Sequence, residues 1–162
     1  MDPEKLTQKS QEAIRDAQAL ATRRHHQAVD VEHLLAALLA QPQGLVPALL
    51  ERAGVDVRAL GERVEAELNR IPQVSGANAQ VYIAPRLARV LDQAQAEATA
   101  LKDEYVSVEH LLIAMLEERG ATGRLLGQMG LARAKLMEAL RAVRGNQRVT
   151  SPDPESTYEA LE

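Results

Sequence analysis

Two Glu-His pairs, Glu32-His33 and Glu109-His110, carry the side chains best suited to chemistry, and they recur at an offset of 77 residues. Histidine and carboxylate are both zinc ligands, so a metal site is one hypothesis for these pairs. The structural alternative is that a histidine at the third position of a helix caps its N-terminus or packs between helices. We favour the structural interpretation and predict neither a metal site nor catalytic residues.

The motifs of the common enzyme classes are missing from this sequence. It contains no cysteine, which excludes thiolate chemistry, disulfides and Cys-ligated zinc. It also lacks a P-loop, an H-E-x-x-H zinc motif and a G-x-S-x-G nucleophile turn. We therefore expect a binding domain that carries no cofactor of its own. A stand-alone helical enzyme or metal protein is the least supported alternative.

Composition narrows the possible partners. The net charge is −4, from 19 basic and 23 acidic residues without long runs of like charge, and only three residues are aromatic. This pattern does not favour nucleic acid, which attracts basic patches and stacking aromatics. No apolar stretch is long enough to span a membrane, and the polar N-terminus is not a signal peptide, so we expect a cytoplasmic protein.

The elements that position the two Glu-His pairs belong to an internal repeat. "VDVEHLLAALL" from Val29 matches "VSVEHLLIAML" from Val106 at eight of eleven positions. The match extends upstream and downstream, which indicates two copies of a unit of roughly 70 residues. We assign residues 1–70 to the first repeat, 71–84 to a linker and 85–144 to the second repeat, the two packing as one domain. Residues 145–162 are assigned to a mobile linker and the start of a further segment.

Apolar spacing of three and four residues predicts helices throughout both repeats. The expected fold is all-α, with about eight helices in two four-helix repeats related by a pseudo-two-fold axis. We expect Thr7, Asp30 and Ser107 to be N-caps, and Gly54 and Gly130 to follow the third helix of each repeat. The remaining expected helices cover about 7–24, 56–70, 85–101 and 131–143.

Two further expectations concern polar side chains. His25 and His26 follow the first helix, and we expect them at the surface. On the helix at 85–101, Glu97 falls with Arg89, Asp92 and Gln93 on the face opposite the apolar stripe, which should be solvated.

The stretch "LTQKSQEAIRDAQALA…HHQAVDVEHLLAALL" resembles the Clp repeat, which occurs in duplicate at the N-terminus of Clp-type AAA+ unfoldases. "LNRIPQVSG" at Leu68 and "STYEALE" at Ser156 are similar to the ClpB-type disaggregase branch. The resemblance implies a substrate-engaging domain of a chaperone that extracts unfolded or aggregated polypeptides, together with a DnaK-type system. It also implies that ATP and Mg belong to other modules of a homohexamer, while this chain alone is monomeric and not an enzyme.

The resemblance further implies a contact surface that carries Thr7, Asp103 and Glu109. From the residues themselves we add as candidate substrate-binding residues Glu32, which the repeat makes equivalent to Glu109, and the apolar Tyr105 and Val106. From spacing alone, the favoured interpretation of Glu32 and Glu109 is structural, namely first-turn placement beside the helix dipole. Apolar contacts are expected from residues off the core stripe: Leu6, Tyr82, Ile83, Tyr105 or Val106.

The main alternative is the related domain of a protease-coupled unfoldase of the ClpA or ClpC type, which docks adaptors or marked substrates. Glu32 and Glu109 would then receive cationic groups symmetrically, because a carboxylate pairs well with a guanidinium. The "IPQVSG" and "STYEALE" stretches favour the disaggregase interpretation.

Overall fold

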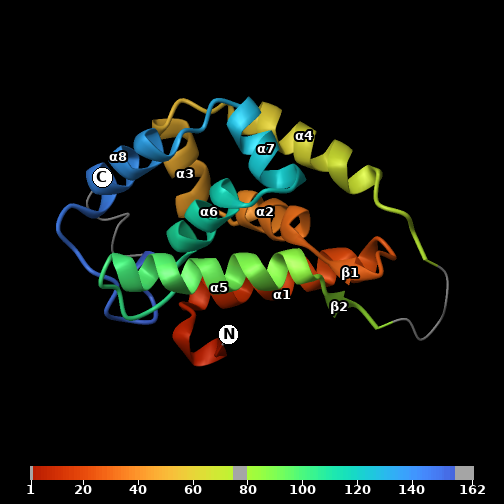
Figure 1. The fold of residues 1–162 in the computed structure, drawn as a ribbon, viewed down its shortest axis with the longest axis horizontal. Coiled ribbons are helices and arrows are strands. Elements are labelled where there is room, and N and C mark those ends of the chain that lie inside the picture. Colours follow the sequence, from red (N-terminus) through yellow and green to blue (C-terminus); the bar gives the residue numbers. More distant parts are fainter. Residues whose placement is uncertain (1, 75–79, 156–162) are drawn as a thin grey trace.

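The computed structural model of this chain describes residues 2–74 and 80–155. The middle of the predicted linker at 71–84, and the helix predicted at "YEALE", lie outside the described residues. Within them the chain is helical, as Figure 1 shows, and the predicted all-α class is confirmed.

Eight α-helices lie within the described residues, four in each repeat. Their bounds are α1 Gln8–Arg23, α2 Val31–Ala40, α3 Leu45–Arg52, α4 Val57–Asn69, α5 Pro85–Ala100, α6 Val108–Glu117, α7 Ala121–Gln128 and α8 Arg133–Arg144. The expected bounds were correct to within a few residues, because caps and turn glycines mark the helix ends in the sequence.

The predicted helix signals are present at their positions. Thr7 caps α1 by accepting a hydrogen bond from Ser10 N, while Asp30 and Ser107 cap α2 and α6. Gly54 and Gly130 follow α3 and α7 with φ of 88° and 90°. That left-handed conformation is open to glycine at no steric cost, which explains why a glycine ends each of these helices.

Short elements tie the two repeats together. A single 3₁₀ turn, η1, covers Pro3–Lys5, and two-residue strands β1 (Ala28–Val29) and β2 (Tyr82–Ile83) pair in parallel. Leu6 forms an isolated parallel bridge with Val106, so the segment before α1 in the first repeat is held against the loop before α6 in the second.

The helices are arranged in layers around one shared core. Figure 1 shows α1 and α5 on one side, α2 and α6 in the middle, and α3, α4, α7 and α8 beyond them. The buried faces of α1 and α5 are rich in alanine, which lets these helices approach the Leu-rich α2 and α6 closely. A single cluster of buried apolar side chains includes residues of both repeats, so each repeat completes the core of the other.

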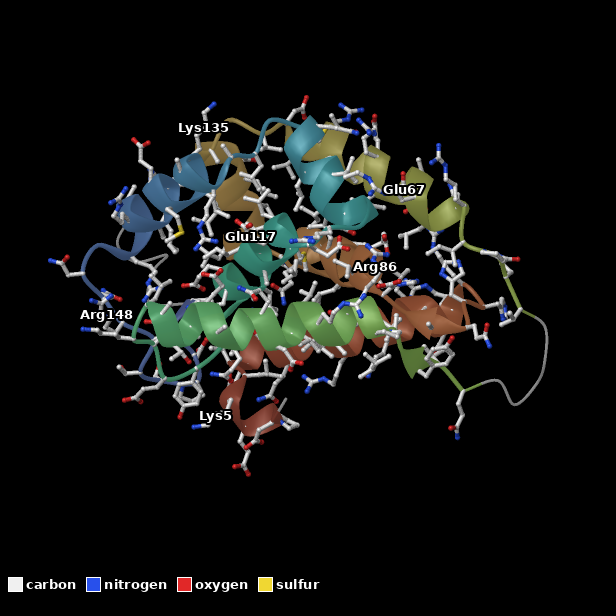
Figure 2. All side chains as sticks on the ribbon, viewed as in Figure 1. Lys5, Glu67, Arg86, Glu117, Lys135 and Arg148 are labelled. Atoms are coloured by element: carbon white, nitrogen blue, oxygen red, sulfur yellow. The ribbon has the colours of Figure 1, made fainter. Side chains whose placement is uncertain are left out.

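The chain after α8 returns to the other side of the molecule. It runs from the outer helix layer to the layer of α1 and α5, shown in blue in Figure 1. Arg148 is exposed at the outer edge in Figure 2, whereas its neighbour Val149 is fully buried.

No single helix in the described part of the chain is long and apolar enough to cross a membrane; α2 and α3 meet that criterion only together, with a 92° bend between them.

Candidate functional site

Several predicted substrate-binding residues meet where α1 and α6 begin. Thr7 caps α1, Asp103 lies in the loop before α6, and Glu109 lies in the first turn of α6. Two hydrogen bonds hold this junction closed, since Thr7 N and Ser10 Oγ both donate to Val106 O at 3.0 Å. We call Thr7, Asp103, Val106 and Glu109 the α1/α6 site. All four residues are buried.

Asp103 is the centre of the hydrogen-bond network in the α1/α6 site. Its carboxylate accepts bonds from His110 Nε2 at 2.7 Å, from Arg144 Nη1 and Nη2 at 3.0 and 2.6 Å, and from Val149 N at 2.9 Å. Burial by itself raises the pKa of Asp103, but these four donors outweigh it and lower the pKa to about 2. Asp103 is therefore ionised at neutral pH and joins the loop to α6, to α8 and to the chain that follows α8.

Glu109 shares the guanidinium that holds Asp103. Arg144 Nη1 lies 3.5 Å from Glu109 Oε2, and both side chains are almost fully buried. Neither carboxylate oxygen of Glu109 has a hydrogen-bond partner among the described residues. One guanidinium thus serves two buried carboxylates, and the one on Asp103 receives the better geometry.

A third carboxylate enters the α1/α6 site from the far end of the described chain. Glu155 Oε2 accepts bonds from Thr7 Oγ1 at 2.7 Å and from Val108 N at 3.3 Å. Burial, and then the neighbouring charge of Glu109, raise the pKa of Glu155 to about 7. Its other oxygen, Oε1, is buried without a hydrogen-bond partner in the described structure. Sequence reasoning missed Glu155, because nothing in its local pattern sets it apart.

The predicted apolar residues fall into two separate groups, Leu6, Tyr105 and Val106 at the α1/α6 site, and Tyr82 and Ile83 in β2. Tyr105 is half-buried and lines a shallow hollow with Lys5 and Glu104, while Leu6 is buried like Val106. Tyr82 and Ile83 are the exposed large apolar side chains of the described residues, at 53% and 45% exposure. They lie in β2, which the length of α5 separates from the loop before α6 (Figure 1).

Glu32 belongs to a different cluster, around Arg86. Arg86 Nη1 donates to Glu32 Oε1 at 3.0 Å and to Asp30 Oδ2 at 3.2 Å, while its other nitrogens bind Glu118 at 3.0 and 3.2 Å. Burial raises the pKa of Asp30, whereas the bonds from Arg86 and from two backbone amides lower the pKa of Glu118 despite its burial. Arg86 begins the second repeat and binds acids of both repeats, so this cluster joins them.

Both glutamates of the Glu-His pairs therefore already face a guanidinium of their own chain. Glu32 pairs with Arg86 and Glu109 pairs with Arg144. A cationic ligand would have to displace these arginines, which removes the main geometric support for symmetric recognition of cationic groups.

The two histidines of the pairs complete capping boxes. His33 Nδ1 accepts from Asp30 N, and His110 Nδ1 accepts from Ser107 N, both at 2.9 Å. Each ring therefore carries its proton on Nε2 when neutral, and His33 Nε2 lies 2.7 Å from His26 Nδ1. The prediction that His26 is at the surface was wrong: it is 3% exposed, because it accepts this buried hydrogen bond.

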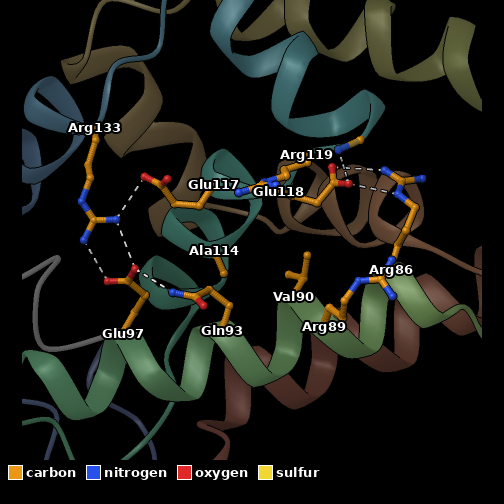
Figure 3. A pocket seen from close by; sticks show the side chains of 11 residues that line it. Arg86, Arg89, Val90, Gln93, Glu97, Ala114, Glu117, Glu118, Arg119 and Arg133 are labelled. Carbon is orange, nitrogen blue, oxygen red and sulfur yellow. Dashed lines mark hydrogen bonds and ion pairs between the residues drawn. The ribbon is translucent and has the colours of Figure 1, made fainter.

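A second, larger hollow of about 890 Å³ opens between α5, the end of α6 and the start of α8. Figure 3 shows Arg133 bridging Glu97 and Glu117 at one end, and Arg86 bound to Glu118 at the other. The prediction that Glu97 lies on a solvated face was wrong, because the two bonds from Arg133 hold it buried and lower its pKa. The charged groups around this hollow are largely paired already.

Comparisons with known proteins agree with this fold and repeat. Residues 5–129 match the family model of the Clp repeat (R) N-terminal domain. The chain belongs to the Clp repeat N-terminal domain family.

Individual relatives indicate to which branch of the Clp-repeat family this chain is most similar. The chain is 50% identical over its whole length to the chaperone protein ClpB of Nitratidesulfovibrio vulgaris, of which it spans 19%. It superposes on the Hsp104 N-terminal domain of Candida albicans with a TM-score of 0.82 at 23% identity, covering 93% of this chain and 98% of that one. A ClpV N-domain solved as a complex with a VipB peptide gives a TM-score of 0.71 at 21% identity over 89% of each chain.

The sequence identity places this Clp-repeat domain with ClpB. Curated ClpB relatives match at 36–50% identity, and they match the chain as the N-terminal domain of a much longer protein. The assignment to the ClpB branch, which rested on "LNRIPQVSG" and "STYEALE", is thereby confirmed over the protease-coupled alternative.

Proposed function

We propose that this domain binds unfolded or aggregated polypeptide weakly and presents it to the ATPase ring of a longer ClpB-type chaperone. The domain itself is non-catalytic, and ATP and Mg act in other modules. In the complete protein the domains form a homohexamer in the cytoplasm that works with a DnaK-type system, and six tethered copies offset weak binding at each one. The isolated chain is a monomer, which sedimentation tests directly.

One observation carries this proposal: the α1/α6 site already holds a non-helical stretch of polypeptide. Glu104 N donates to Val149 O and Gln8 N donates to Pro152 O, both at 2.8 Å. These are backbone donors that recognise a chain by its main-chain carbonyls, whatever its sequence. Main-chain recognition suits a chaperone, because its substrates share a backbone and little else.

Nuclear magnetic resonance tests the proposal on the isotopically labelled chain. Reduced, carboxymethylated α-lactalbumin serves as a permanently unfolded polypeptide, and backbone shifts are followed during titration. We expect shifts that cluster at Gln8, Glu104 and the first turn of α6. The proposal is wrong if no amide moves at any polypeptide concentration. A phosphorylated guanidinium ligand that moves Glu32 and Glu109 together would instead support recognition of marked substrates.

A further inference from the structure

Residues 148–155 lie on the α1/α6 site as a bound peptide would. Val149 is fully buried, and its backbone N–H and carbonyl bond to Asp103 Oδ1 and Glu104 N at 2.9 and 2.8 Å. Three residues further on, Pro152 O accepts from Gln8 N, and then Pro154 and Glu155 are buried again. The segment therefore has two anchors, Val149 and Pro154-Glu155, separated by exposed residues.

The two anchors differ in how completely their polar groups are hydrogen-bonded. Val149 is held by two short backbone bonds and an apolar contact. At Glu155, one buried carboxylate oxygen has no partner in the described structure, and the side chain faces the carboxylate of Glu109, which also lacks a hydrogen bond. An unsatisfied buried oxygen and a like charge both oppose binding. This end of the segment is consequently the weaker one.

The segment also covers the residues that the family resemblance marks for substrate contact. Thr7 has 0% exposure while its hydroxyl donates to Glu155, and Asp103 is enclosed by Arg144 and Val149. A polypeptide can therefore reach these side chains only after the 148–155 segment has left.

We propose that residues 148–155 are a displaceable internal occupant of the polypeptide-binding surface, which an extended substrate segment replaces. This inference rests on the proposed function and specifies its site. The fitting substrate has an apolar residue in the place of Val149 and, six positions later, a side chain that accepts bonds from Thr7 and Val108. A neutral amide fits that last place better than a carboxylate, because its NH₂ group donates to Glu109 instead of repelling it. Only molecules from which the segment has been released can bind substrate. The apparent association constant for substrate is therefore the intrinsic one multiplied by the fraction of released molecules.

Opposite variants of the full chain test the proposal. Glu155→Gln keeps an acceptor for Thr7 and supplies a donor for Glu109, so it should hold the segment more tightly. Val149→Ser removes the apolar anchor and should release it. Ser151→Ala, at an exposed position of the same segment without a side-chain hydrogen bond in the described structure, is the matched control. Exchange protection of the Glu104 and Gln8 amides reports whether the segment is bound, and fluorescence anisotropy of labelled, reduced and carboxymethylated α-lactalbumin reports its dissociation constant.

For Val149→Ser we expect loss of amide protection and about tenfold tighter polypeptide binding, as for a competitor that occupied roughly nine molecules in ten. For Glu155→Gln we expect slower exchange and severalfold weaker binding, and for Ser151→Ala no change in either. Absence of protection in the unmodified chain overturns the proposal, as does unchanged binding when Val149→Ser has lost protection. If polypeptide binds to none of the variants, the proposed function fails as well, so the two failures are distinguishable.

Discussion

Asp103 occupies in the second repeat the position that His26 occupies in the first, and each accepts a hydrogen bond from Nε2 of its repeat's capping histidine. The two repeats thus share one arrangement: a histidine caps the N-terminus of α2 or α6 through Nδ1, and its Nε2 donates to the residue at this equivalent position. In the first repeat the partner is neutral, and burial, then the neighbouring Arg24, lower the pKa of His26. In the second repeat the partner is an anion, and it also accepts hydrogen bonds from Arg144 and from Val149 of the 148–155 segment.

Replacing Asp103 should cost more stability than its small side chain suggests. Asp103→Asn leaves the buried Arg144 with a poorer partner, and breaking a buried ion pair typically costs about 3–5 kcal/mol of unfolding free energy. Urea unfolding measures this loss. Asp92→Asn, at an exposed position of α5, should change stability by less than about 0.5 kcal/mol. Equal effects of the two substitutions would contradict the central role of Asp103.

The low pKa of Asp103 also predicts that the free energy of unfolding falls in acid. Its pKa is about 2 in the folded chain and near 3.8 when unfolded, so the unfolded state takes up a proton first. The stabilisation is complete above pH 4 and is lost as the pH falls toward 2, with an amplitude of about 2 kcal/mol. Urea midpoints measured between pH 5 and pH 2 should show this slope in the unmodified chain and a smaller one in Asp103→Asn.

The two capping histidines should differ in importance. His33→Ala removes a cap and one neutral hydrogen bond, for about 1–2 kcal/mol, whereas His110→Ala also removes a charge-assisted bond to Asp103 and should cost about 2–4 kcal/mol. Thermal unfolding of both variants makes the comparison. His25→Asn is the control, since His25 is exposed with φ of 59°, a conformation that asparagine tolerates. A larger effect at His33 than at His110 would refute this ranking.

Two glycines of α7 provide a steric test of the packing between α6 and α7. A Cβ at Gly123 would lie 1.8 Å from the backbone oxygen of Glu118, whereas at Gly127 it meets open space. Gly123→Ala should therefore destabilise the chain by about 3 kcal/mol or more, because backbone must move. Gly127→Ala should stabilise it by about 0.5–1 kcal/mol through helix propensity. Differential scanning calorimetry should give melting temperatures that shift in opposite directions.

Docking of the 148–155 segment should strengthen as the pH falls. The pKa of Glu155 is about 7 when docked and near its ordinary value of 4.5 when released, so the docked state binds the proton more tightly. The charged neighbour of Glu155 is Glu109 on α6, which in turn lies against Arg144 on α8; Arg144 also binds Asp103, the partner of His110. From pH 8 to pH 6 the docking constant should rise about tenfold, and above pH 8 it should no longer change.

The amide shift of Val149, followed by nuclear magnetic resonance across that pH range, measures this docking. Glu155→Gln is the control, because an amide does not titrate. If its pH dependence equals that of the unmodified chain, Glu155 is not the group responsible.

The sequence by itself determined the helical class, the repeat, the caps and most helix bounds. These depend on residues three or four positions apart, and on an offset of 77 that keeps Val31, His33 and Leu35 in step with Val108, His110 and Leu112. The same offset pairs His26 with Asp103, but this equivalence identifies Asp103 as the partner of His110 only once the hydrogen bond between His26 and His33 is known.

Only the tertiary structure decided how the charged groups are used. Arg144 lies 41 residues from Asp103, Glu155 lies 148 residues from Thr7, and Arg133 lies 36 residues from Glu97. No local pattern links such residues, because their contacts form only when helices far apart in the sequence pack together and the chain after α8 folds back over them. Whether a carboxylate is solvated or buried against an arginine follows from that packing, and so does the closing of the α1/α6 site by the chain's own 148–155 segment.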